Sequence, residues 1–384
     1  MLSCQRDLFS LPEGPIYLNC AYMSPTLKAS EAAGVAGLRR KNDPASIGPA
    51  DFFAPVDALR ELVGRLVNAG PERVAFVPSV SYGLALATRN VPLHTGQNVV
   101  VPDEEFPSNV YGWMERCREQ GGELRLVPRP GDTARPGTVW SERMLEAIDA
   151  RTAAVSITAL HWADGTLFDL ERIARRTREV GAFLVLDGTQ SIGAVPFDFQ
   201  KLQPDLLICA GYKWCLGPYS YGFAVLGDRL LEGRPLEDAW QHRAGSEDFS
   251  SLIHYTETLR SGGRRFDMGE QANLVAVPML SEALRQILQW GVENIQAYCE
   301  ALADDLRQAL AASPYSLALK GQQGSHMFGI HVPGEGQVAA VLEALGRRGI
   351  SVSQRGNAIR VSPHLYNRRE DMAALAETLL SVGA

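Results

Sequence analysis

Short apolar runs alternate with amphipathic stretches between about residues 70 and 230. Seven of these runs have the length and the near-continuous apolar character of strands that are buried on both faces. They are residues 74–77, 97–102, 123–127, 153–158, 183–186, 206–210 and 222–226. Helical spacing of apolar residues marks the segments between them, as in residues 170–180. This alternation predicts an α/β domain in which helices sandwich a mostly parallel, seven-stranded sheet.

The pattern changes after residue 275. A long helical stretch over residues 277–313 is followed by strand-like residues 329–332, a helix over 337–348, strand-like residues 358–362 and a final helix from Arg369. This order predicts a small α+β domain at the C-terminus. We expect an N-terminal arm at residues 1–15 that packs on the small domain, a large domain at 16–262 and the small domain at 263–384.

Composition narrows the class of protein. The 384 residues are 46% hydrophobic and 21% charged, which are ordinary globular values, and the net charge of -7 argues against a nucleic-acid partner. We expect no membrane association and a cytoplasmic location, because the sequence shows neither an apolar run of about 20 residues nor a secretory leader. The six cysteines form no CxxC pair and the seven histidines show no metal-ligand spacing, so we predict no metal.

Polar residues follow two neighbouring predicted strands. Asp187 comes directly after the run 183–186, and Lys213 follows the run 206–210 among aromatic and small residues. Ligands bind at the carboxyl ends of strands in such sheets. Taken singly, Asp187 is equally explained as a helix cap and Lys213 as a side chain that reaches solvent.

Together the two residues favour a pyridoxal-phosphate (PLP) site. A desolvated lysine is a nucleophile toward an aldehyde, so Lys213 is expected to hold the cofactor as a Schiff base. Asp187 is expected to keep the pyridine nitrogen protonated, and Gln190 to donate to the phenolic oxygen of the ring. Val80 and Ser81 begin a predicted helix after another strand, where a helix N-terminus is suited to binding the phosphate.

Four segments carry a resemblance to a known family. Residues 186–191 (LDGTQS), 210–214 (AGYKW), 105–109 (EFPSN) and 264–270 (RRFDMGE) resemble elements of the class V aminotransferase family, a group of fold-type I PLP enzymes that includes the cysteine desulfurases. The resemblance covers essentially the whole chain. It implies the fold-type I PLP-transferase fold and a homodimer whose active site lies near the interface.

The resemblance also implies roles for single residues. Arg360 falls where the family places the arginine that binds the substrate α-carboxylate, and a planar guanidinium suits that task. Asn109 is expected to contact the substrate. Tyr212 replaces the histidine that precedes the lysine in desulfurases, and is expected to bind the phosphate.

Two departures from the desulfurase pattern bear on function. The histidine that stacks on the cofactor ring is displaced, which leaves His161, Trp162 and Phe106 as candidates, and neighbours on a strand point to opposite sides. No cysteine follows Cys299, so the loop before Arg360 lacks the thiol on which desulfurases form a persulfide. A desulfurase of the usual mechanism is therefore not expected.

The function that these observations favour is catalysis on a free α-amino acid through an external aldimine, with transamination as the default. C–S lysis by β-elimination and epimerisation or racemisation use the same first steps and stay open. The alternative of another class is a non-catalytic sensor with the PLP fold. A cofactor absorbance that responds to amino acids separates the enzyme from the sensor.

Overall fold

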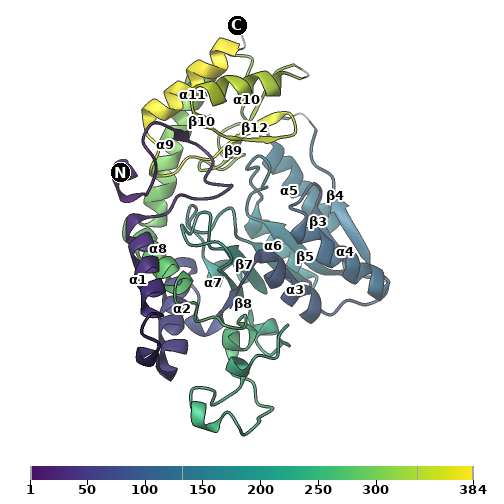
Figure 1. Cartoon of the computed structure of the whole chain (residues 1–384). Helices are drawn as coiled ribbons and strands as arrows, with labels where there is room; N and C mark the ends of the chain where they lie inside the picture. The colour runs from purple at the N-terminus through teal and green to yellow at the C-terminus, as the bar shows by residue number, and fades with distance from the viewer. Residues whose placement is uncertain (1, 132, 335, 383–384) are drawn as a thin grey trace.

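A seven-stranded sheet forms the centre of the computed structural model, which describes residues 2–131, 133–334 and 336–382 (Figure 1). The strand order is β2-β8-β7-β6-β5-β3-β4. The bounds are β2 (Val74–Val77), β3 (Asn98–Pro102), β4 (Glu123–Val127), β5 (Thr152–Thr158), β6 (Phe183–Asp187), β7 (Leu206–Ala210) and β8 (Gly222–Leu226). β8 pairs antiparallel with β2 and β7, and the other neighbouring strands pair in parallel. The predicted mostly parallel sheet of seven strands is confirmed.

Alternate residues of the strands pack into two separate apolar cores, one on each face of the sheet. Val100 packs in one core, whereas Val99 and Val101 pack in the other. The first core includes residues of α2 (Ala54–Val67), α5 (Pro136–Ala147), α6 (Leu170–Glu179) and α8 (Ala276–Trp290). The second includes residues of α3 (Val80–Asn90) and α4 (Ser108–Gln120). Helices therefore cover both faces, as the apolar strands require.

The C-terminal part holds a three-stranded antiparallel sheet in the order β11-β12-β9. Its strands are β9 (Phe328–His331), β11 (Ser353–Arg355) and β12 (Ala358–Val361), and its helices are α9 (Val292–Leu310), α10 (Gln337–Arg347) and α11 (Arg369–Val382). The long helical stretch predicted over residues 277–313 is divided between α8 and α9. The break falls at Gly291, whose φ of 77° lies in the left-handed region that glycine adopts without strain.

The N-terminal segment lies beside the C-terminal part of the chain (Figure 1). β1 (Ile16–Tyr17) pairs in parallel with β10 (Ile350–Ser351), and Leu18 packs in a third apolar core with residues of α9, α10 and α11. By contrast, α8 packs against α1 (Lys28–Arg40) and α2. The domain boundaries expected from the sequence stay a prediction.

Short elements complete the chain. In the part of the chain that the structure describes, they are α7 (Phe199–Leu202) and eight 3-10 helices, η1 (Arg6–Leu8), η2 (Pro44–Ser46), η3 (Pro49–Phe52), η4 (Pro71–Arg73), η5 (Asp228–Leu230), η6 (Trp240–His242), η7 (Phe249–Ser251) and η8 (Gly262–Phe266). None of the helices in the described residues is long and apolar enough to span a membrane.

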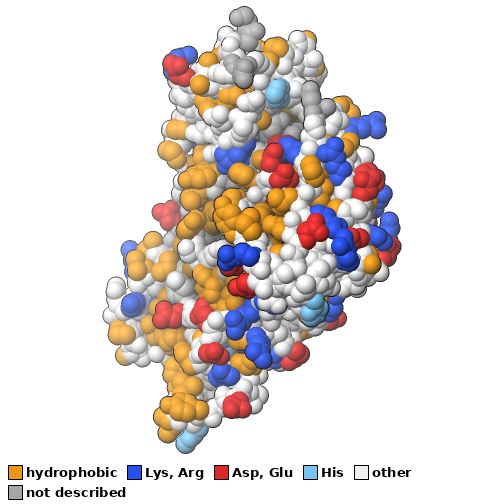
Figure 2. Space-filling model, turned by 90° about the vertical axis from the view of Figure 1, so that its right-hand side faces the viewer, with side chains coloured by type: hydrophobic (Ala, Val, Ile, Leu, Met, Phe, Trp, Pro, Cys, Tyr) orange, Lys and Arg blue, Asp and Glu red, His pale blue; other side chains and the backbone are white. Residues whose placement is uncertain are grey.

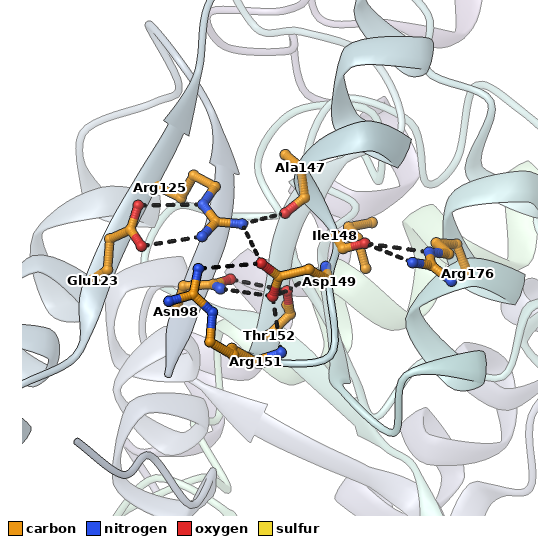
Figure 3. A network of polar contacts seen from close by, with 9 residues as sticks. All are labelled: Asn98, Glu123, Arg125, Ala147, Ile148, Asp149, Arg151, Thr152 and Arg176. Atoms are coloured by element: carbon orange, nitrogen blue, oxygen red, sulfur yellow. Dashed lines mark hydrogen bonds and ion pairs between the residues drawn. The ribbon is translucent and has the colours of Figure 1, made fainter. Parts of the chain in front are cut away.

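A polar network ties together the amino-terminal ends of β3, β4 and β5 (Figure 3). Asp149 accepts hydrogen bonds from Asn98 Nδ2 at 3.1 Å, from the Arg151 backbone N–H at 2.8 Å and from Arg125 Nη1 at 3.1 Å. Burial would raise the pKa of Asp149, but these donors outweigh it and hold the pKa well below the ordinary value. One carboxylate thus joins the strands at their amino-terminal ends, whereas Asp187 lies at the carboxyl ends.

We predict that Asp149→Ala lowers the free energy of unfolding by about 1–3 kcal/mol, since several donors lose their acceptor. The folded state releases the Asp149 proton more readily than the unfolded chain, so the stabilising contribution is present above pH ~4 and is lost as the pH falls. Chemical denaturation at pH 7 and at pH 3.5 measures both effects. Equal stability of the variant and the parent protein at pH 7 would contradict the role given to Asp149.

Candidate active site

The carboxyl ends of β2, β5, β6 and β7 surround a cavity of about 300 Å³. Val80, Ser81, Trp162, Asp187, Gln190, Tyr212 and Lys213, all predicted from the sequence, line this cavity. Glu105, Phe106, Thr158, Thr189 and Tyr219 line it as well. Polar side chains from segments far apart in the sequence therefore converge where the parallel strands end.

Lys213 extends into this cavity from the turn that follows β7. Its Nζ lies 5.6 Å from the centre of the Tyr212 ring and 6.0 Å from that of the Phe106 ring. Among the described residues, no carboxylate forms an ion pair with Nζ. Burial lowers the pKa of Lys213 to about 8; the charge of Asp187 opposes this shift, and the charge of Arg360 adds to it. At pH 7 about one amine in ten is thus neutral and nucleophilic, far more than for an ordinary lysine.

Asp187 ends β6 and is almost fully buried. Its Oδ1 accepts from the backbone N–H of Thr189 at 2.8 Å, and its Oδ2 accepts from Asn109 Nδ2 at 3.0 Å. Asn109 does not line the cavity, although the sequence analysis gave it a contact with the substrate. It lies behind Asp187 at the start of α4 and fixes the orientation of the carboxylate.

Glu105 is a buried carboxyl of the cavity wall to which the sequence analysis gave no role. Its Oε1 accepts from the Phe106 backbone N–H at 2.7 Å, whereas Oε2 has no hydrogen-bond partner among the described residues. Burial raises the pKa of Glu105 to about 8, and the charge of Asp187 contributes to the shift. The protonated, neutral form is therefore favoured at pH 7. Two signals in the sequence pointed to Glu105: its position after a strand end and its place in the segment 105–109, which resembles a family element.

Gln190 is held by two contacts on its amide. Nε2 donates to the Ala21 carbonyl at 3.1 Å, and Oε1 accepts from Trp214 Nε1 at 2.9 Å. The amide nitrogen keeps a second hydrogen, and the side chain lines the cavity. The expected donor to the cofactor ring is thus placed at the cavity in a fixed orientation.

The first turn of α3 borders the other end of the cavity. Ser79 caps the helix, because its Oγ accepts from the Tyr82 backbone N–H at 3.1 Å. The N–H groups of Val80 and Ser81 have no partner within the helix, since they precede its first hydrogen-bonded turn. Together with the Ser81 hydroxyl, they offer donors to an anion at the positive end of the helix dipole.

The structure distinguishes between the candidates for stacking on a cofactor ring. Phe106 and Trp162 line the cavity and contact each other edge to face, with centroids 5.5 Å apart. His161 faces the interior instead, where its ring contacts Arg129 Nη2 at 2.9 Å and the Glu104 carbonyl at 3.0 Å. We therefore withdraw His161 as a cofactor-binding residue and keep Trp162 and Phe106.

Arg360 lies on β12, behind the cavity. Its Nη1 donates to the Trp162 carbonyl at 2.6 Å, while Nε and Nη2 are buried without a partner among the described residues. Burial, followed by the charge of Arg355, lowers the pKa of Arg360 to about 9. A buried guanidinium with open donors that faces no carboxylate is suited to receive an anion from a ligand.

These residues fit PLP. The amine of Lys213 suits the aldehyde of the cofactor. The oriented carboxylate of Asp187 suits its ring nitrogen, and the N-terminus of α3 suits its phosphate. The donor set thus matches three chemically different parts of one molecule.

Comparison with known proteins agrees with this chemistry. The family model for aminotransferase class-V matches residues 49–375. A probable cysteine desulfurase of Methanothermobacter thermautotrophicus is 26% identical over 347 residues, covering 83% of this chain and 82% of the relative. The uncharacterized aminotransferase YcbU of Bacillus subtilis is 26% identical over 314 residues, covering 82% and 80%.

Solved structures share the fold. The cysteine desulfurase CsdA of Escherichia coli matches with a TM-score of 0.81 and 19% identity over 98% of this chain and 97% of that one. The cystine C–S lyase C-DES, in complex with its product cysteine persulfide, matches with a TM-score of 0.85 and 19% identity over 97% and 99%. The chain belongs to the aminotransferase class-V family. It is a PLP-dependent enzyme, a transferase or a lyase.

Glu105→Gln should remove a pH dependence of stability. In the folded protein Glu105 keeps its proton up to about pH 8, whereas in the unfolded chain the proton leaves near pH 4. The folded state therefore holds one more proton between these values, and raising the pH through this window favours unfolding. Glutamine is neutral at every pH, so the variant should lose less stability between pH 6 and pH 9 than the parent.

Chemical denaturation of the cofactor-free protein at both pH values makes this comparison. Glu104→Gln is the matched control, since Glu104 is a neighbouring carboxylate that pairs with Arg129 at 2.8 Å outside the cavity. An identical loss of stability for the parent and Glu105→Gln would show that Glu105 is ionised in the fold.

Proposed function

We propose that the protein is an aminotransferase acting on free α-amino acids, with Lys213 as the residue that carries the cofactor covalently. The observation that supports this most is the lysine itself. Its amine lies in a cavity opposite Asp187, has no carboxylate partner among the described residues, and has a pKa lowered by burial to about 8. This combination suits an amine that attacks an aldehyde and later moves a proton.

In this proposal each residue has one task. Bound PLP supplies an electron sink for the electrons released at the substrate Cα. Asp187 keeps the ring nitrogen protonated, and Asn109 Nδ2 and the Thr189 N–H hold its carboxylate in place. Lys213 Nζ accepts the Cα proton and returns it, while Arg360 binds the α-carboxylate.

The remaining residues bind the cofactor. Val80 and Ser81 donate to the phosphate from the first turn of α3, and Tyr212, which lines the cavity, donates to it as well. Gln190 donates its second amide hydrogen to the ring oxygen. Phe106 and Trp162 pack against the ring and exclude water from it.

A second candidate is direct C–S lysis, which the desulfurase names of several relatives favour. Catalysis through a protein persulfide is not part of this proposal. No cysteine follows Cys299 in the sequence, and Cys20, whose thiol is close enough to Lys213 to sense its charge, is buried. Burial raises the pKa of Cys20 to about 12, so the thiol stays protonated and unreactive.

The test begins with Lys213. Addition of PLP to the cofactor-free protein should give a yellow product at a rate that rises with pH, with a midpoint near 8 rather than near the ordinary lysine value. Borohydride reduction and peptide mapping should place the cofactor on Lys213, and Lys213→Arg should remain colourless after reduction and washing. Mapping to another lysine would overturn the assignment.

Product analysis then separates the reactions. Incubation with amino acids should convert bound PLP to its amine form with release of a keto acid, and a second keto acid should reverse this change. Sulfide release from cysteine without a persulfide on any of the six cysteines would favour C–S lysis instead. A protein whose absorbance responds to no amino acid would support the sensor and contradict both candidates.

We also propose a homodimer, on the strength of the family and of one surface. The segment around η6 and η7 projects from the molecule, and hydrophobic side chains gather at the corresponding lower tip in Figure 2. The exposed apolar residues there are Trp240, Phe249, Leu252, Ile253 and Tyr255. The nearby arginines are engaged within the chain, Arg264 with Asp57 at 3.0 Å and Arg265 with Glu232 at 2.8 Å.

Light scattering should give twice the mass of the chain, and Ile253→Asp with Tyr255→Asp should shift the protein toward the monomer. These substitutions place charge on an apolar surface that a second copy would bury. A monomeric parent protein with bound cofactor and full activity would contradict a shared active site.

A further inference from the structure

Two arginines lie side by side on the face of the small sheet that is turned toward the cavity. β11 and β12 pair with Ser353 opposite Arg360 and Arg355 opposite Ala358. Residues two apart on a strand share a face, so Arg355 and Arg360 project from the same side. The other side of the sheet is apolar, because Ile359 and Val361 pack there with Phe328 and Ile330 in the third core.

Both guanidinium groups converge on Trp162. Arg360 donates to its carbonyl, and the Arg355 guanidinium carbon lies 5.1 Å from the centre of its ring. Trp162 lines the cofactor cavity and also an open groove of about 920 Å³, of which Arg355 forms part of the wall. Arg355 therefore lies in the groove, against the ring of a residue that the groove shares with the cavity.

Neither arginine is neutralised by the protein. Among the described residues, no carboxylate forms an ion pair with Arg355 or Arg360; Arg355 Nη1 donates to the Gln354 carbonyl at 2.6 Å, and its Nε is buried without a partner. The neighbouring carboxylates Glu104 and Asp164 are both occupied by Arg129, at 2.8 Å each.

The uncompensated charge of Arg355 changes the pKa values of neighbouring groups. Burial lowers the pKa of Arg355, and the charge of Arg355 in turn lowers the pKa values of Arg360 and Lys213. Two partly desolvated cations that repel each other cost free energy unless anions occupy the space between them. The α-carboxylate of an amino acid neutralises one guanidinium and leaves the second open.

We infer that the substrate is an α-amino acid with a second acidic group on its side chain, and that Arg355 binds this group while Arg360 binds the α-carboxylate. Diagonal neighbours on paired strands lie roughly 7–8 Å apart, with their Cβ atoms somewhat closer, a separation that two long arginine side chains and a small dicarboxylic acid bridge together. This inference rests on the proposed function, whose site it completes with a specificity-determining residue.

The test compares acids with their own amides on the holoenzyme. L-Aspartate with L-asparagine, and L-glutamate with L-glutamine, differ in one charge at nearly constant shape. We expect the concentration that half-saturates the change in cofactor absorbance to be at least about 10-fold lower for one of the acids than for its amide, because a charge-assisted bidentate contact is made to the acid alone.

Arg355→Gln should raise that concentration about 10- to 100-fold for the preferred acid and leave the amide within about 2-fold. Arg355→Lys keeps the charge without the planar fork and should fall between the two. Arg347→Gln is the control, because it removes the same charge from an exposed arginine of α10 that pairs with Glu343. Unchanged acid selectivity is expected for this control.

Three results would overturn the inference. The first is equal binding of acids and amides by the parent protein, and the second is an equal loss for both in Arg355→Gln, as expected if both arginines share the α-carboxylate. Either of these leaves the proposed function intact, since amino acids still bind. The third is an absorbance that responds to no amino acid, which overturns the proposed function as well.

Discussion

Helices cover both faces of the central sheet, and this burial limits where ionisable side chains can lie. Every residue of β2, β3, β5, β7 and β8 is buried, so a polar side chain within these strands would have to find its partners inside a core. The ionisable groups of the site instead lie at or just beyond the strand ends. Asp187, Glu105 and Lys213 line one cavity at the carboxyl ends, whereas Asp149 joins the strands at their amino-terminal ends.

The reactivity of the site follows from the same burial. Desolvation favours the neutral forms of Lys213 and Glu105, so it lowers the pKa of the lysine and raises that of the glutamate. Two donors, Thr189 N–H and Asn109 Nδ2, hold the Asp187 carboxylate in one orientation. An amine with a lowered pKa and an oriented carboxylate thus line the same cavity.

Residue type and strand position were enough to predict the sheet and to predict that Asp187 and Lys213 line one site. Both predictions rest on patterns within short segments of the sequence. Contacts between distant segments were not predictable in this way. His161 and Trp162 are adjacent and both contact the Glu104 carbonyl, but His161 also contacts Arg129 Nη2 from a distant segment, in the interior. The short strand β11 carries no apolar pattern, so the register that places Arg355 beside Arg360 is visible only in the folded chain.

Several buried polar atoms around the candidate site have no hydrogen-bond partner among the described residues. Folded proteins pair nearly all of their buried polar groups, because an unpaired one costs about 1–3 kcal/mol. Glu105 Oε2, Asn109 Oδ1, Arg355 Nε and two nitrogens of Arg360 are nevertheless buried without partners among the described residues. A proton on Glu105 removes the negative charge of the carboxyl group that lacks a partner. The arginines have no such remedy, because an arginine keeps its proton; in the proposed function the carboxylates of the substrate supply the missing acceptors.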